Sequence, residues 1–192
     1  MSRICEINRK TKETDITLSL SLEGGEVCIE TGIGFFDHML TSFAVHSGFG
    51  LKIKAIGDLN VDCHHTVEDV GIVLGQALKS TVGDKKGIKR FGSSFVPMDD
   101  ALCFCALDIS GRAYLVYNAT FQNVSCGSYE TAMTKEFMYA VATNAMITLH
   151  LKCEYGDNDH HKTEGLYKAF ARALKEAVKL EGETILSSKG TL

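Results

Sequence analysis

The pattern of apolar and polar positions switches between two periods along the chain. Residues 16–22 (ITLSLSL) alternate between apolar and polar side chains, as expected of a strand with one buried face. In residues 64–82 the apolar positions Val67, Val70 and Leu74 recur every three or four residues, which is typical of an amphipathic helix. The chain is therefore predicted to contain both strands and helices.

The predicted elements follow the same order in both halves of the chain. In the first half we expect strands at 16–22 and 26–31, a helix at 35–48, a strand at 51–57 and a helix at 64–82. In the second half we expect strands near 93–97, 101–109 and 113–120, a helix near 129–146, a strand near 148–153 and a helix near 160–180. The order strand, strand, helix, strand, helix thus occurs in both halves, with one further strand at the start of the second, and indicates an internal duplication. Its halves are predicted as residues 1–92 and 93–192, in one compact unit without a linker.

Composition narrows the class of protein. The 192 residues are 45% hydrophobic and carry a net charge of −4, which favours a globular domain and argues against a nucleic-acid binder. The longest apolar run, Ala101–Leu107, is too short for a membrane span, and the first twenty residues lack the apolar core of a signal peptide. Seven widely spaced cysteines without a CxxC motif predict reduced thiols in the cytoplasm. Cys103 and Cys105 alternate within a predicted strand, so we expect them in the core rather than as metal ligands.

The duplication carries a chemical marker, a histidine pair followed by a glutamate. His64-His65-Thr-Val-Glu68 recurs as His160-His161-Lys-Thr-Glu164, and the offset of 160 − 64 = 96 is half the chain length. Each string opens a predicted helix, where residues four apart share a face and adjacent residues diverge by about 100°. The two histidines of one string therefore cannot comfortably bind the same ion.

This geometry predicts two metal ions, each bound by residues of both repeats. One ion would take His160, Glu164 and His65, and the other His64, Glu68 and His161. Imidazole and carboxylate without thiolate suit Mn, Fe or Zn in an open, reactive site. The alternative is a pair of polar helix starts with glutamates favoured by the helix dipole. That alternative explains neither the doubled histidine nor its recurrence.

Each ion needs a further ligand. His38 lies early in a predicted helix, in GFFDHML, and Asp37 is positioned in sequence to orient it. The corresponding second-half helix carries Glu136, at an offset of 98, for which an exposed surface role is the alternative. His46 is either a site residue or a cation at a helix end.

A candidate phosphate-binding group lies beside glycine turns. Guanidinium, hydroxyl and ammonium groups are what an anionic oxygen cluster requires, although each such residue alone is more typical of a solvated turn. The candidates are Arg90, Arg112, Ser187, Ser188 and Lys189.

Several strings together resemble the imidazoleglycerol-phosphate dehydratase family: GIGFFDHML, HHTVEDVGIVLG, KGIKRFG, DNDHHKTEGLYKAFARAL and SSKG. The resemblance runs from Thr11 to Lys189 and is to the stand-alone bacterial form. It implies an α+β fold (an α/β two-layer arrangement), internally duplicated, with each half a four-stranded sheet packed against helices. It further implies a homo-oligomer in which trimers assemble into a 24-mer, with active sites between subunits.

The resemblance also implies two Mn²⁺ ions per active site and assigns their ligands. The first set is His38, His65, His160 and Glu164. The second is His64, Glu68, His161 and the position of Glu136, where this chain departs from members that carry histidine. A carboxylate can also coordinate Mn²⁺. The implied substrate-binding residues are Glu13, His46, Arg90, Arg112, Lys168, Ser187, Ser188 and Lys189, with Glu13 as the catalytic acid–base.

The implied reaction converts D-erythro-imidazole glycerol phosphate to imidazole acetol phosphate plus water in histidine biosynthesis. The carbon that loses a hydrogen in this reaction has no carbonyl group next to it, so that hydrogen is not acidic. If both ring nitrogens of the substrate bind metal ions, its imidazole becomes an imidazolate. The electron density of this ring can expel the side-chain hydroxyl next to it, which gives a diazafulvene-like intermediate. Two other classes fit a doubled metal motif. A binuclear metallohydrolase would need a bridging hydroxide instead of ring nitrogens, and a ferritin-type metal-storing cage would need a four-helix bundle.

Overall fold

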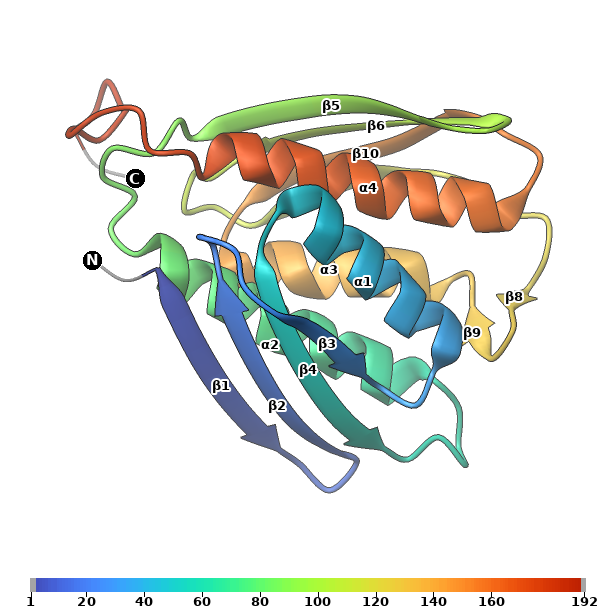
Figure 1. Ribbon diagram of the computed structural model, residues 1–192. Coiled ribbons are helices and arrows are strands. Elements are labelled where there is room, and N and C mark those ends of the chain that lie inside the picture. The colour runs from blue at the N-terminus through green and yellow to red at the C-terminus, as the bar shows by residue number, and fades with distance from the viewer. Residues whose placement is uncertain (1–2, 191–192) are drawn as a thin grey trace.

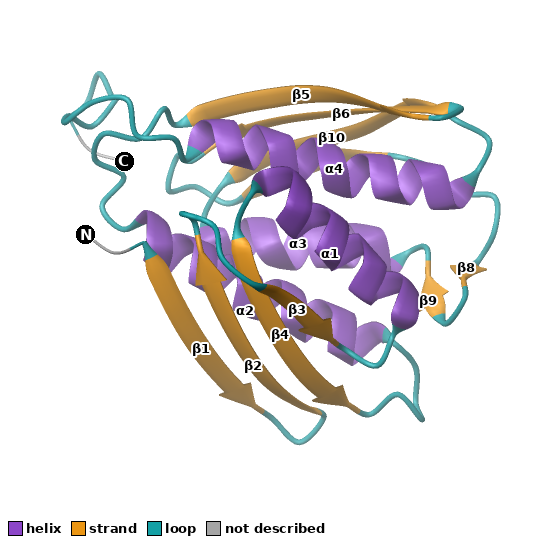
Figure 2. Cartoon of the chain, viewed as in Figure 1, coloured by secondary structure: helices purple, strands orange, loops and turns teal. Residues whose placement is uncertain are grey.

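The computed structural model describes residues 3–190 as two four-stranded sheets with four helices between them (Figure 1). The helices are α1 (Gly34–Ser47), α2 (His64–Val82), α3 (Met133–Ala145) and α4 (Asp159–Ala177). None of the helices in this part of the chain combines the length and the apolar composition needed to cross a bilayer. Each half thus places helices on one face of a sheet, which confirms the predicted α+β class (Figure 2).

The two sheets share one topology. The first-half strands are β1 (Ile4–Lys10), β2 (Thr14–Ser21), β3 (Val27–Glu30) and β4 (Gly50–Gly57), in the spatial order β1-β2-β4-β3. The second-half strands are β5 (Phe91–Met98), β6 (Ala101–Asp108), β7 (Tyr114–Asn118) and β10 (Thr148–Tyr155), in the order β5-β6-β10-β7. In both sheets only the last pair is parallel. The equal order supports the duplication, while the exact division at residue 92 stays a prediction.

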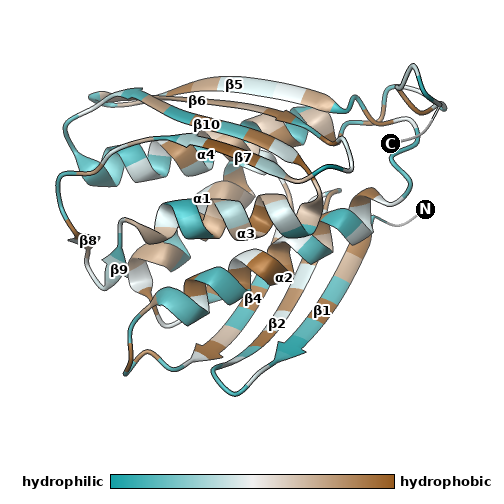
Figure 3. Ribbon diagram, turned by 180° about the vertical axis from the view of Figure 1, so that it is seen from behind, coloured by the Kyte–Doolittle hydropathy of each residue, from teal (hydrophilic) through white to brown (hydrophobic). Residues whose placement is uncertain are grey.

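The apolar alternation places one face of each sheet against the helices. Ile16, Leu18 and Leu20 of β2 are fully buried, and apolar and polar positions alternate along the strands of the first sheet in Figure 3. Cys103 and Cys105 of β6 are fully buried free thiols, which confirms their prediction as core residues.

The two halves are joined helix to helix, α1 against α4 and α2 against α3. The ring of Phe36 in α1 packs edge-on against that of Phe137 in α3, with the ring centroids 5.3 Å apart. Phe137 stacks on Tyr167 of α4 at the same centroid distance of 5.3 Å. The Phe36–Phe137 contact crosses from one repeat to the other, as does the stacking of Phe43 of α1 on Phe170 of α4, with ring centroids 5.4 Å apart. A single core therefore serves both halves.

The structure differs from the predicted elements in three places. Strand β1 was not predicted, because it is an edge strand with no fully buried residue and therefore has little apolar signal. The third helix begins at Met133 rather than near residue 129, because Tyr129–Glu130 form β9, paired with β8 (Ser125–Cys126). The last helix ends at Ala177 rather than near residue 180.

Candidate active site

Both histidine–histidine strings open helices, as the sequence predicts. In α4 the side chain of Asn158 caps the helix and accepts from the backbone N–H of His160 (2.9 Å) and of His161 (3.4 Å). In front of α2 the Asp62 carboxylate accepts from the backbone N–H of His64 at 2.7 Å. These hydrogen bonds hold the backbone at the two helix starts from which the histidine pairs leave.

Within the described residues one candidate metal-binding cluster is formed, by His38 of α1 with His160 and Glu164 of α4. One donor atom of each lies within 4.8 Å of the others. Glu164 Oε2 is 3.5 Å from His38 Nε2 and 3.3 Å from His160 Nε2. Two imidazoles and a carboxylate form a donor set suited to Mn, Fe or Zn, so the residues fit the metal that the sequence predicts.

Glu164 is held in its charged form. Its side chain is only 9% exposed, and its second oxygen pairs with the Lys168 ammonium at 2.7 Å. Burial opposes ionisation, but the hydrogen bond and charge of Lys168, together with His38 and His160, outweigh it and hold the pKa of Glu164 below its ordinary value. A buried carboxylate that is already ionised is suited to bind a cation.

The second histidine of each string is oriented by a carboxylate instead. Nδ1 of His65 donates to Asp58 at 3.0 Å, and Nδ1 of His161 donates to Asp100 at 2.5 Å. The hydrogen bond that His65 donates to Asp58 raises the pKa of His65. Since Nδ1 is used in both histidines, Nε2 is the atom left to bind a metal, which is the usual arrangement of a carboxylate–histidine–metal triad.

The remaining predicted ligands do not complete a cluster within one chain. His65, expected beside His38, His160 and Glu164, lies at the start of α2 with Asp58 and is not part of that cluster. His64 and Glu68 approach each other to 3.6 Å. Glu136 lies half-buried on α3 in a hollow beside Lys135 and Tyr139, and it joins no group of three metal-binding side chains among residues 3–190.

Two of the predicted substrate-binding residues lie beside predicted metal ligands. Glu13 Oε1 is 4.0 Å from Nε2 of His65. Lys168 pairs with Glu164, as described above. The pKa of His46 is lowered by burial and then by the positive charges of Lys168 and Arg172, while the charge of Glu164 opposes this shift. His46 lines a hollow with Arg172 and Glu176, farther along α4 than the metal cluster.

The loops that carry the predicted phosphate-binding residues lie towards the C-terminal end of α4, away from the helix start that holds His160 (Figure 1). Arg90 makes two hydrogen bonds to Asp108 and donates to the backbone carbonyl of Leu186 at 2.6 Å, which places it beside the segment that carries Ser187, Ser188 and Lys189. Arg112 follows the neighbouring strand β6. The backbone N–H of Arg90 donates to Ala177, the last residue of α4. These groups are therefore separated from His160 by the whole length of α4.

Sequence reasoning missed the residues that orient the histidines. Asp58 and Asp100 lie 7 and 61 residues from their histidine partners, so spacing within one helix gives no signal for them. Asp37, expected to orient His38, accepts instead from the backbone N–H of Thr31 at 2.9 Å and from its hydroxyl. As the residue next to His38, Asp37 points to another side of α1, and it closes the junction with β3.

The sequence is similar to that of a known protein family. The family model for imidazoleglycerol-phosphate dehydratase matches residues 31–174. The imidazoleglycerol-phosphate dehydratase of Acetivibrio thermocellus is 56% identical over the full length of both chains, and that of Streptococcus sanguinis is 56% identical over 99% of this chain and the whole of the other.

Two solved structures of the same family have a similar fold. The crystal structure of imidazoleglycerol-phosphate dehydratase from Staphylococcus aureus is 41% identical, with a TM-score of 0.84 over 93% of this chain and 99% of that chain. The Pyrococcus furiosus enzyme, solved in complex with (S)-C348, is 37% identical, with a TM-score of 0.86 over 97% of this chain and the whole of that chain.

The duplicated fold and the imidazole–carboxylate cluster define a metal-dependent enzyme. The comparisons make the assignment specific, because the family model covers most of the chain and the relatives are similar along their full lengths. The chain belongs to the imidazoleglycerol-phosphate dehydratase family. It is a hydro-lyase of histidine biosynthesis, so the metallohydrolase and storage-cage alternatives are set aside.

Proposed function

We propose that the enzyme removes water from imidazole glycerol phosphate at a site holding two Mn²⁺ ions. The cluster of His38, His160 and Glu164 carries this proposal, because three potential ligands of the predicted set already meet there. The first ion would be completed by His65. The second would be bound by His64, Glu68, His161 and Glu136. Divalent ions bound there would stabilise negative charge on the substrate's imidazole ring.

We propose further that each active site is shared between subunits. From His160 to Ala177 the rise of α4 is roughly 26 Å at 1.5 Å per residue. The imidazole and the phosphate of the substrate are separated by only three carbons. Arg90 and the metal cluster of one chain therefore cannot both contact one substrate molecule. A homo-oligomer, predicted as trimers assembled into a 24-mer, brings these groups together across subunit boundaries.

Residues from different chains would then contact different parts of the substrate. His65 with its neighbour Glu13 would come from a second chain, which places the Glu13 carboxylate next to the substrate's side chain as general acid–base. Lys168, which pairs with Glu164, would contact the polar side chain of the substrate beside the first ion, together with His46. Arg90, Arg112, Ser187, Ser188 and Lys189 bind its phosphate through charge-assisted hydrogen bonds.

We also propose that the enzyme works in the cytoplasm. All seven cysteines are free thiols, three of them buried, which is the state that a reducing compartment maintains.

Reconstitution of metal-stripped protein tests the proposed function. Addition of Mn²⁺ is expected to restore turnover of imidazole glycerol phosphate in proportion to bound metal, up to two ions per chain. Full turnover by protein that contains no divalent metal would overturn the proposal. A Glu164→Gln variant under the same conditions is the matched control and should stay inactive.

A further inference from the structure

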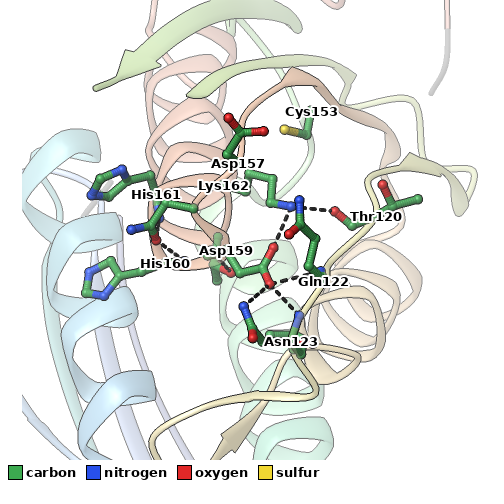
Figure 4. Close-up of polar contacts among 12 residues, drawn as sticks. Thr120, Gln122, Asn123, Cys153, Asp157, Asp159, His160, His161 and Lys162 are labelled. Atoms are coloured by element: carbon green, nitrogen blue, oxygen red, sulfur yellow. Dashed lines mark hydrogen bonds and ion pairs between the residues drawn. The ribbon is translucent and has the colours of Figure 1, made fainter. Parts of the chain in front are cut away.

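Helix α4 begins with a buried ion pair that lies next to the two histidines in sequence. The side chains of Asp159 and Lys162 form this pair one helical turn apart, and they are only 2% and 5% exposed. Asp159 directly precedes His160 and His161. Figure 4 shows both histidines leaving α4 on the side away from Gln122 and Asn123. Asp159 and Lys162 therefore flank the two histidines in the sequence, but their side chains point to another side of α4 and are not metal ligands.

Both members of the pair bind the segment that follows β7. The second oxygen of Asp159 accepts from the backbone N–H of Gln122 (2.9 Å), from the backbone N–H of Asn123 (2.6 Å) and from the Asn123 side-chain amide (2.9 Å). The Lys162 ammonium donates to the carbonyl oxygen of Thr120 at 2.9 Å. Four hydrogen bonds thus fasten residues 120–123 to the first turn of α4 (Figure 4).

The same segment reaches the helix that carries His38. The Thr131 hydroxyl donates to the carbonyl oxygen of Asn123 at 2.8 Å, which closes the loop that holds Tyr129. The ring of Tyr129 stacks on Phe36 of α1 at 5.7 Å and contacts Phe35 at 5.5 Å. Phe35 in turn packs edge-on against the imidazole of His160 at 4.9 Å. The loop therefore contacts both helices that contribute ligands to the first cluster.

The equivalent positions at the start of α2 carry no such ion pair. The positions that correspond at an offset of 96 are 159 − 96 = 63 and 162 − 96 = 66, occupied by Cys63 and Thr66. Both are buried, and neither carries a charge. The half with the ion pair is also the half whose histidine string forms a three-residue cluster with α1.

We propose that Asp159 and Lys162 are positioning residues that fix the start of α4 against the 120–131 segment, and thereby hold His38, His160 and Glu164 in metal-binding geometry. This inference rests on the proposed metal-binding function of that cluster. Removing Lys162 leaves a buried carboxylate without its counter-charge, and the surrounding structure relaxes to solvate it. Because Asp159 is adjacent to His160, that relaxation moves the ligands.

The test is a titration of the metal-stripped full chain with Mn²⁺. The electron paramagnetic resonance signal of the free ion measures how much Mn²⁺ remains unbound. Lys162→Met is expected to weaken Mn²⁺ binding at the cluster of His38, His160 and Glu164 about tenfold, in the range found when groups that support a metal ligand are lost. It should also change the visible absorption of the Co²⁺-substituted protein, which reports on ligand geometry. Lys162→Arg, which keeps the positive charge, should restore most of the affinity.

Lys89→Met is the matched control, because Lys89 forms an ion pair with Glu176 at the far end of the same helix, at 2.6 Å. Loss of that pair should lower the melting temperature and leave Mn²⁺ affinity and the Co²⁺ spectrum unchanged. Asn123→Ala removes one of the three N–H donors to Asp159 without leaving a charge unpaired. It should weaken Mn²⁺ binding less than Lys162→Met does, and it decides the question if Lys162→Met does not fold.

The outcomes separate this inference from the proposed function. If the unmodified chain binds no Mn²⁺, the metal-binding proposal itself fails. If it binds Mn²⁺ and the folded Lys162→Met variant, or Asn123→Ala in its place, shows the same affinity and the same Co²⁺ spectrum, only the positioning role is overturned.

Discussion

The two halves repeat the same strands and the same histidine string, yet they surround that string differently. In the second half Glu164 is 9% exposed, pairs with Lys168 and meets His160 and His38 within 4.8 Å. In the first half Glu68 is 45% exposed and approaches only His64, at 3.6 Å. The position corresponding to Lys168 is 168 − 96 = 72, where Ile72 offers no charge.

The difference shows that the duplication kept the ligands but not their surroundings. Spacing at the start of a helix is enough to place a histidine and a glutamate on one face. In the second half a lysine, a buried environment and a ligand from the neighbouring helix surround the pair, and among residues 3–190 only this pair joins a three-residue cluster. We therefore expect the two metal sites to differ in affinity, with the cluster in the second half the tighter of the two.

The largest expected effect contrasts the carboxylates at two equivalent hairpin turns. Glu13, before β2, lies 4.0 Å from His65, and Asp99, between β5 and β6, lies 3.5 Å from His161. Glu13→Gln is expected to lower turnover by about 10²- to 10⁴-fold with metal content unchanged, because general acid–base catalysis is lost. Asp99→Asn is the matched control and should retain most of the turnover. Equal loss in the two variants would remove the special role of Glu13.

A second prediction compares the glutamates of the two strings by metal titration. Glu164→Gln should weaken the tighter site by at least about tenfold, since the loss of a ligand costs no less than the loss of a group that supports one. Glu68→Gln should weaken only the looser site. Isothermal titration of metal-stripped protein with Mn²⁺ measures both. If Glu68→Gln weakens the tighter site and Glu164→Gln the looser one, the order of the halves is reversed.

Glu136 gives a smaller effect, confined to the looser site. Glu136→Ala should lower the affinity for the second Mn²⁺ equivalent without changing the first, because Glu136 is proposed as a ligand of that ion alone. Glu136→His should restore two-ion binding and shift preference from Mn²⁺ towards Zn²⁺, since imidazole is the softer ligand. Lys135→Ala, at the neighbouring position, is the control. Unchanged binding of both ions by Glu136→Ala would show that Glu136 is not a ligand.

The smallest effect concerns the charge around the tighter cluster. Burial, Lys168 and Arg172 lower the pKa of His46, so its neutral form is favoured in the folded chain. The unfolded chain then binds more protons, and the free energy of unfolding should rise with pH between the lowered pKa and about 6.5. Arg172→Met should move the pKa of His46 upward, as measured by NMR titration. An unchanged pKa would mean that Arg172 does not act on His46.

The sequence predicted local features well and distances between elements poorly. Periodicity located all four helices, and the strings placed their histidines at two helix starts, because both depend on spacing within one element. Strand β1 was missed because an edge strand lacks buried residues. The separation of His65 from His38, and the oriented contacts of Asp58 and Asp100, depend on how helices and loops pack, which spacing does not encode.

The chain's resemblance to a known family predicted what periodicity did not, namely the reaction and the roles of Glu13 and Lys168. Even so, the pair of Asp159 and Lys162 was not identified from the sequence. Lys162 stands between a histidine pair and a glutamate, where a charged residue at a helix start is typical of a solvated surface. Only its burial and its bond to Thr120 show that it belongs to the interior.

The central claim is that one active site takes its metal cluster and its phosphate-binding residues from different chains. Mixing two inactive variants, Glu164→Gln and Arg90→Ala, in one assembly tests it directly. Random mixing in equal amounts should recover about one quarter of the original turnover, because a quarter of the shared sites receive an intact cluster from one chain and an intact Arg90 from another. Mixing Glu164→Gln with His38→Ala, whose defects lie in one cluster, should recover none. No recovery from the first mixture, in particles shown to contain both chains, would contradict the account.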